Sequence, residues 1–264
     1  MNNKTVLERY GYEQSLRRVL RLKSLIFYGF AYMMPLTIFT SYGIVQQITH
    51  GMLALAYVVC TIAMVFTATS YMQMVKVYPM AGSVYSYAQR SINPYVGFLG
   101  GWAILMDYLL MPILCYVCAA IYLKTIFPGI PTAVIVIVLI LGMSAVSFVG
   151  IQMTSIVNNT LVILQCIFVL AFLMFVFDWI YKGNGEGTFI SVKAFFNSYE
   201  FRQEGVGIGA LFAGASVLAI SFLGFDAVTT VAEETIEPEK MIGRAILIIC
   251  IGAGSLFVFE SYMY

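Results

Sequence analysis

The best candidates for functional residues in this chain are carboxylates that lie within apolar segments. Asp107 lies about halfway along one apolar run, within WAILMDYLLMP, and Asp226 and Glu233 lie near the end of another, within SFLGFDAVTTVAEET. An ionisable group at membrane depth costs from roughly 2.5 kcal/mol upward and generally faces a bundle interior or a cavity. Because no lysine or arginine lies near the depth of Asp107, its carboxyl is either protonated and hydrogen-bonded to a neighbouring helix or meets a cation that comes and goes.

Acids and aromatic rings together suit an organic amine as ligand. Carboxylates neutralise ammonium groups, and aromatic faces add a cation–π attraction of about 0.5 to 2 kcal/mol. Asp226 and Glu233 have a second interpretation, because they approach the end of their run and a solvated acidic turn follows. The other acids of that turn are Glu234, Glu237 and Glu239.

Catalytic chemistry is not expected. The sequence offers no nucleophile–base pair and no metal-ligand spacing, and its one histidine, His50, falls in a predicted loop. Cys115-x-x-Cys118 lacks a second cysteine pair and is interpreted as packing within a span. We therefore expect no enzyme activity, no cofactor, no metal and no nucleic-acid partner.

The elements that must hold these residues are membrane spans. Hydrophobic residues make up 61% of the 264, charged residues make up 10%, and mean hydropathy is +0.90, whereas soluble domains carry roughly 25% charged residues. A helix needs about 20 apolar residues to cross a hydrocarbon core of about 30 Å. Six complete runs and an incomplete seventh predict an all-α membrane protein in the lipid bilayer, at about 24–46, 53–75, 96–123, 131–150, 157–181, 207–232 and 245–264.

The basic residues predict the orientation and the division of the chain. Ten of the 14 precede the first span or fall in alternate loops on the same side, which places the amino terminus in the cytoplasm by the positive-inside rule. We expect a cytoplasmic tail (1–23), spans one to five (24–181), an external loop (182–206) and span six with an incomplete span seven (207–264). The segment 76–95 is expected to be re-entrant or interfacial.

Two of the predicted spans contain residues that favour a break in the helix. Span one contains Gly29 and Pro35 in YGFAYMMPLTIF, and span six contains Ser221, Gly224 and Asp226. Proline removes a backbone donor, and the freed backbone groups of a broken membrane helix must face protein or water. Pro35 alone would also suit an ordinary kink. Interrupted helices in corresponding positions of two halves, here five spans apart, indicate the binding site of a transporter.

Two longer segments bear a family resemblance. YPMAGSVYSYAQRSINPYVGFLGGW (78–102) resembles the proline, Ala-Gly, Tyr-x-Tyr and Gly-Phe-x-x-Gly-Trp segment of the amino acid–polyamine–organocation permeases, and SFLGFDAVTTVAEET resembles their sixth-helix segment. Within that superfamily, FAYMMPLTIF, LMDYLLMP and FLGFDAVTTVAEET look most like bacterial putrescine importers. The resemblance runs through essentially the whole chain.

The resemblance implies a leucine-transporter-type fold of two inverted five-helix repeats, driven by a proton or cation gradient. This chain would supply the first repeat, helix 6 and part of helix 7, as the amino-terminal portion of a permease. Glu233 matches the sixth-helix glutamate associated with putrescine recognition. Gln165 departs from the pattern. Several amino-acid permeases have a lysine at this position, and the charge of that lysine takes the place of a bound cation.

The expected function is therefore the import of a small organic amine, most specifically putrescine, across the cell membrane by alternating access. An amino-acid permease of the same fold is the close alternative, and an inactive remnant or non-transporting membrane protein is the third. The predicted substrate-binding residues come from the two breaks and from span three: Ala31, Tyr32, Met33, Pro35, Asp107, Tyr108, Ser221, Phe222, Gly224, Phe225, Asp226 and Glu233.

Overall fold

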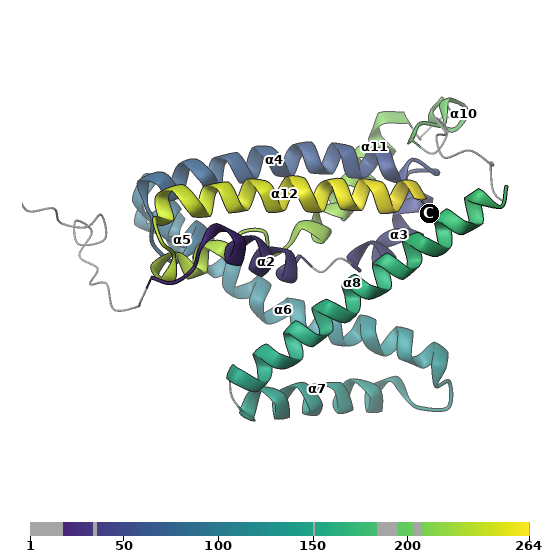
Figure 1. Ribbon diagram of the computed structural model, residues 1–264, viewed down its shortest axis with the longest axis horizontal. Helices are drawn as coiled ribbons and strands as arrows, with labels where there is room; N and C mark the ends of the chain where they lie inside the picture. The colour runs from purple at the N-terminus through teal and green to yellow at the C-terminus, as the bar shows by residue number, and fades with distance from the viewer. Residues whose placement is uncertain (1–17, 34–35, 150, 184–194, 203–206, 264) are drawn as a thin grey trace, which may run out of the picture. The chain divides into compact units, whose positions relative to one another are not determined.

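The regular elements of the chain are helices (Figure 1). The computed structural model describes residues 18–33, 36–149, 151–183, 195–202 and 207–263. Within the first of two compact units, residues 1–83 with 162–264, the helices are α2 (Leu22–Tyr32), α3 (Thr37–Ile48), α4 (Leu53–Val77), α10 (Ser198–Phe201), α11 (Gly207–Leu218), η1 (Ala219–Phe222), η2 (Ala227–Glu234) and α12 (Pro238–Met263). The second unit, residues 84–161, contains α6 (Pro94–Ile126) and α7 (Thr132–Val149), whereas α5 (Ser83–Ser91) and α8 (Ile151–Tyr181) cross the unit boundary.

Six of the described helical segments are long and apolar enough to cross a membrane, and α2 with α3 would make a seventh span as one bent pair. The chain is therefore a multi-pass membrane protein. The seventh run differs in where it starts, because α12 begins at Pro238, ahead of the apolar run expected from about residue 245. Proline suits the first helical position, where its missing N–H has no partner to lose, so the helix includes a polar turn that hydropathy alone does not count.

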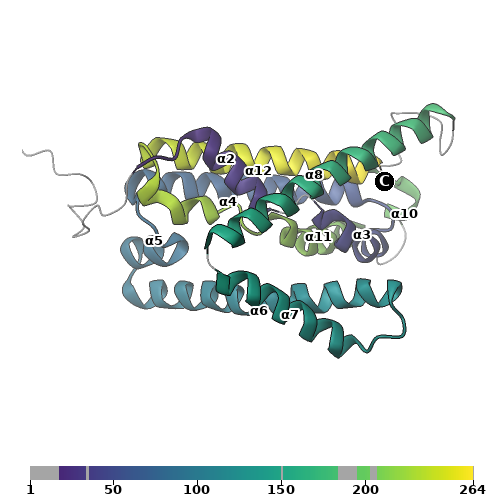
Figure 2. The same cartoon turned by 60° about the horizontal axis from the view of Figure 1, so that its bottom comes forward.

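An antiparallel pair, α4 and α12, forms the centre of the first unit. The two helices run side by side in both views (Figures 1 and 2). Small residues on α12 allow the close approach: a Cβ added at Gly254 would lie 2.6 Å from Thr61 Oγ1, and one added at Gly243 would lie 2.5 Å from Met72 Cγ. Close packing of small residues is the main attraction between helices in lipid, which supplies no hydrophobic drive.

The remaining helices of this unit pack around that pair. α2 contacts α12, and α11 contacts both α3 and α4. Their buried side chains include Leu25 of α2, Ile38 of α3 and Leu218 of α11, each with no exposed surface. The first and sixth spans are thus both fixed to α4 and α12, directly or through a neighbour.

Glycines explain how the second unit holds α5 against α6. A Cβ at Gly97 would lie 2.5 Å from Gln89 Cβ, and one at Gly101 would lie 2.8 Å from Tyr85 Cδ2. The glycines of the Gly-Phe-x-Gly-Gly-Trp sequence therefore form the contact surface for this short helix. Asn93 caps α6 by accepting a hydrogen bond from the Val96 N–H at 2.8 Å. Segment 76–95 contains the short helix α5, and its re-entrant or interfacial position stays a prediction.

The α4–α12 contact predicts a specific sensitivity to glycine substitution. Gly254→Ala places a methyl group against Thr61, so we expect the free energy of unfolding to fall by about 1–3 kcal/mol, as for overpacked cores. Gly209→Ala is the matched control, because a Cβ on that glycine of α11 would meet no atom within 4 Å. Thermal unfolding of both purified variants in detergent tests this, and equal stability of the two would contradict the packing described.

Candidate functional site

The sixth span is broken between α11 and η2. Helix α11 ends at Leu218, the 3₁₀ turn η1 follows, and Gly224 adopts φ +91° before η2 begins at Ala227. A residue with a side chain rarely adopts a φ of this kind. The backbone satisfies itself locally, since the N–H of Phe225 donates to the Phe222 carbonyl (3.3 Å) and that of Ala227 to the Gly224 carbonyl (3.0 Å).

The first span changes direction at the corresponding place. Helices α2 and α3 are bent 51° to each other; α2 ends at Tyr32, and the Met33 N–H donates to the Gly29 carbonyl at 3.1 Å. Pro35, which the sequence analysis assigns to this break, lies outside the described residues. Among the described residues of the break, Met33 is buried, Ala31 is half-buried and Tyr32 is exposed.

The two breaks are in direct contact. A Cβ added at Gly224 would lie 2.9 Å from Tyr32 Cβ and 3.1 Å from the Tyr32 carbonyl oxygen. The absence of a side chain at Gly224 therefore lets the end of α2 touch the turn of span six. Tyr32, Ser221, Phe222 and Phe225 are brought into one region by this contact, with Ser221 and the two phenylalanines buried.

Asp226 is held by protein groups next to this break. Its Oδ2 accepts a hydrogen bond from Ser83 Oγ at 2.8 Å, and Tyr71 of α4 is in hydrogen-bonding contact with both Ser83 and Asp226. The Tyr71 ring also packs edge-on against Phe225 at 5.3 Å. Asp226 thus links η2 to α4 and to the start of α5.

Glu233 lies past the break, near the end of η2, and is half-buried. Helix η2 begins at Ala227 and is interrupted by a non-helical residue, Val231, before it reaches Glu233. The neighbouring Glu234 carbonyl accepts hydrogen bonds from the N–H groups of Val19 (2.8 Å) and Leu20 (2.9 Å). In the described conformation, Glu233 therefore stands at the far end of η2 and not at the turn itself.

Asp107 and Tyr108 belong to α6 of the second unit, and both side chains are exposed. No hydrogen bond or ion pair of the Asp107 carboxyl occurs within the part of the chain that the structure describes. The sequence-based choice between a protonated acid and a cation partner stays open for this residue.

A buried polar cluster, which the sequence did not predict, lies beside the break in span six. We define it as Ser41 of α3, Tyr57 of α4, Ser221 of η1 and Glu260 of α12. The Tyr57 hydroxyl lies 3.2 Å from Ser221 Oγ and is in hydrogen-bonding contact with Ser41. Glu260 was visible in sequence as an acid in an apolar run, but nothing local indicated its neighbours.

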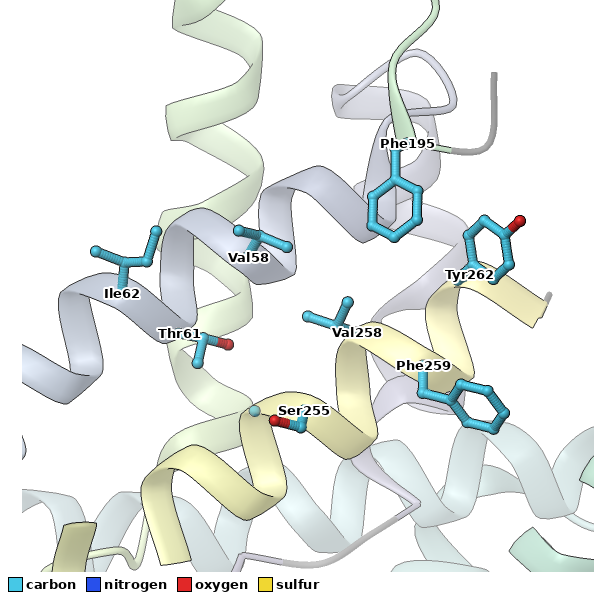
Figure 3. A pocket seen from close by; sticks show the side chains of 9 residues that line it. Val58, Thr61, Ile62, Phe195, Ser255, Val258, Phe259 and Tyr262 are labelled. Atoms are coloured by element: carbon cyan, nitrogen blue, oxygen red, sulfur yellow. The ribbon is translucent and has the colours of Figure 1, made fainter. Parts of the chain in front are cut away.

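An apolar hollow lies on a different part of the α4–α12 pair (Figure 3). Its volume is about 400 Å³, and Val58, Ile62, Val258 and Phe259 supply much of its wall. Thr61 and Ser255 contribute hydroxyls, and no carboxylate lines it. This hollow lacks the charge that an amine ligand requires.

Broken first and sixth spans that meet at their breaks are a feature of membrane carriers whose discontinuous helices surround a substrate site. The chain belongs to the amino acid permease family, whose model matches residues 25–264. The chain is a transporter-family protein, and its family is not one of enzymes.

Three relatives illustrate the range of this family. The chain is 36% identical to the low-affinity putrescine importer PlaP of Escherichia coli K12, over 94% of this chain and 53% of that protein. It is 25% identical to the branched-chain amino acid permease BcaP of Bacillus subtilis, over 94% and 55%, and 25% identical to the chloroplastic cationic amino acid transporter 7 of Arabidopsis thaliana, over 88% and 42%. The chain spans about half the length of these relatives.

The Ser83–Asp226 contact predicts coupled effects on stability. Ser83→Ala and Asp226→Asn each remove one partner, so the double variant should cost less than the sum of the two, with a coupling of about 1–3 kcal/mol for a hydrogen bond to a charged group. Thermal unfolding of the four proteins in detergent measures it. Ser83→Ala combined with Glu239→Gln is the control, for which the effects should add; full additivity for Ser83 and Asp226 would refute the contact.

Proposed function

We propose that this protein is a secondary-active importer of a small organic amine, with putrescine as the first candidate, working by alternating access in the cell membrane. The contact of Gly224 with Tyr32 carries the proposal, because it joins the two broken spans into one place where backbone groups and aromatic rings can surround a substrate. A proton or cation gradient is proposed as the driving force. The 36% identical relative, whose name describes a putrescine importer, supports the amine as substrate.

The acids divide into two roles in this proposal. Asp226 is already engaged by Ser83 and Tyr71, so we assign it to bracing the break. Asp107 and Glu233 are proposed as partners for the ammonium groups of the substrate, Asp107 from α6 and Glu233 from η2. Because Glu233 lies beyond the turn in the described conformation, its engagement requires movement of η2 during transport.

The competing function is amino-acid transport on the same fold. It is favoured by the names of the two 25% identical relatives, and in it the amide groups at the first break would hold a carboxylate. An amino acid needs one ammonium partner, whereas a diamine uses two, so the requirement for a second acid separates the two substrates. The third class is a membrane protein that does not transport.

Uptake of radiolabelled putrescine tests the proposal in cells that lack their own polyamine importers, with the complete reading frame expressed. We expect saturable uptake that excess amino acids leave unchanged. Asp107→Asn and Glu233→Gln should each raise KM by roughly tenfold or more, which corresponds to about 1.4 kcal/mol of lost binding. Glu239→Gln, a charge change at the start of α12, is the control and should leave uptake unchanged.

The alternatives give different results in the same assay. Uptake erased by an ordinary amino acid, with both acid variants still active, would replace the amine with an amino acid. Absence of uptake for either substrate, with the protein present in the membrane, would favour the non-transporting class.

A further inference from the structure

Glu260 is a fully buried carboxyl that has no partner among the described residues. Its exposed fraction is 0%, and neither of its two oxygens has a hydrogen-bond partner in that part of the chain. It lies one turn beyond Phe257 on the inner face of α12, where the Phe257 ring packs 5.5 Å from the Tyr57 ring and 5.6 Å from the Phe222 ring. Glu260 therefore sits in the layer that joins α12 to α4 and to η1.

The hydroxyls of the polar cluster are engaged elsewhere. Ser41 Oγ donates to the carbonyls of Thr37 (3.3 Å) and Ile38 (3.4 Å), and Tyr57 and Ser221 are hydrogen-bonded to each other. Because Ser41 donates to those carbonyls, its contact with Tyr57 uses the Tyr57 proton, and Ser221 then donates to the Tyr57 oxygen. The Tyr57 hydroxyl, which interacts electrostatically with Glu260, is thus the donor that can turn from Ser41 to Glu260.

The charged groups on α2 and η2, which pack against α12, are distant from Glu260. Elements α2, α3, α4, η1 and η2 contact α12. Glu233 and Glu234 lie on η2, and Lys23 lies in the first turn of α2, close to the paired residues Leu20 and Thr235. These lie at the Pro238 end, and 22 residues of helix separate Pro238 from Glu260, roughly 33 Å.

The titratable groups nearer to Glu260 are uncharged ones. Tyr57 of α4 is the group that interacts electrostatically with it, and Cys60 on the same helix interacts with Cys250 of α12. The remaining titratable side chains are Tyr42 of α3, Tyr28 and Tyr32 of α2, Tyr71 and Lys76 of α4, and Glu239, Lys240, Arg244 and Tyr262 of α12 itself. Helix α8 also packs against α12, through Phe177 and Phe259, and its charged residues Asp178 and Lys182 pair with each other in exposed positions. Within the described part of the chain, no basic group is hydrogen-bonded to Glu260.

An unpaired carboxylate in such surroundings is far more costly than a neutral acid, because burial removes the water that stabilises the charge. The described conformation thus suits Glu260 with its proton bound. We propose that Glu260 is the proton-binding site of this carrier, linked to the break in span six through Tyr57 and Ser221. The inference rests on the proposed transport function and names the ion and the residue that would drive it.

Release of the proton changes Glu260 from a neutral acid to a carboxylate. The O–H bond of the Glu260 carboxylic acid breaks, the proton leaves to water on the side to which the site is open, and the carboxylate accepts a hydrogen bond from the Tyr57 hydroxyl, which turns away from Ser41 while Ser221 keeps its bond to Tyr57. Ser221 lies three residues before Gly224, so this rearrangement reaches the turn that contacts Tyr32. Gln165 cannot supply a titrating charge, and Glu260 does.

Infrared spectroscopy of the purified complete protein tests the site without requiring transport. As pH is lowered, we expect the carbonyl stretching band of a protonated carboxylic acid to grow, and Glu260→Gln should remove one such band. Glu239→Gln on the same helix should remove none, and Glu260→Asp should move the band while keeping an acid there. An unchanged band in Glu260→Gln would overturn the proposal. A band that sodium chloride abolishes and choline chloride does not would also overturn it, because that result indicates a sodium site.

Transport of putrescine into proteoliposomes is the second test of the proton role of Glu260. Glu260→Gln should lose putrescine accumulation driven by a pH gradient by at least tenfold but retain exchange of internal for external putrescine. Accumulation equal to the unaltered protein would overturn the proton role. If the unaltered protein moves no putrescine, the proposed function fails, and the infrared band still decides whether Glu260 binds a proton.

Discussion

Backbone hydrogen bonding inside a membrane is the constraint on which this structure depends. A helix that stops within the hydrocarbon region leaves N–H and C=O groups that cost several kcal/mol each unless protein or trapped water satisfies them. Span six meets this demand by tightening into 3₁₀ turns on both sides of Gly224, each with its own short-range hydrogen bonds. The turn is therefore a stable feature of the fold, and it can present backbone groups to a ligand.

Two other features follow from that turn. Gly224 has no side chain, so the end of α2 can approach it, and this approach places the first break beside the sixth. Asp226 then fixes the start of η2 to Ser83 and Tyr71. On the other side of the turn, Ser221 is fixed to Tyr57 of α4. The break is thus anchored on both sides to α4, the helix that packs most extensively on α12.

Much of this arrangement could be predicted from sequence. The apolar runs predicted the spans because hydropathy over about 20 residues is a strong signal, and Gly224 with its polar neighbours predicted the broken sixth helix. The hydrogen bond of Asp226 could not be predicted, because its partner Ser83 is 143 residues away. For the same reason Glu260 received no function: its neighbourhood is made by Tyr57 and Ser221, which are themselves separated by 164 residues. The assignments of Asp107 and Glu233 as substrate residues stay predictions.

The central claim is that the meeting point of the two breaks binds the substrate. The most direct measurement is protection of an introduced thiol in the complete protein, with the native cysteines replaced: Ala31→Cys at the end of α2, and Ser255→Cys on the wall of the apolar hollow. Putrescine should slow thiol labelling at position 31 several-fold and leave position 255 unchanged. Equal labelling of both positions with and without putrescine would contradict the account.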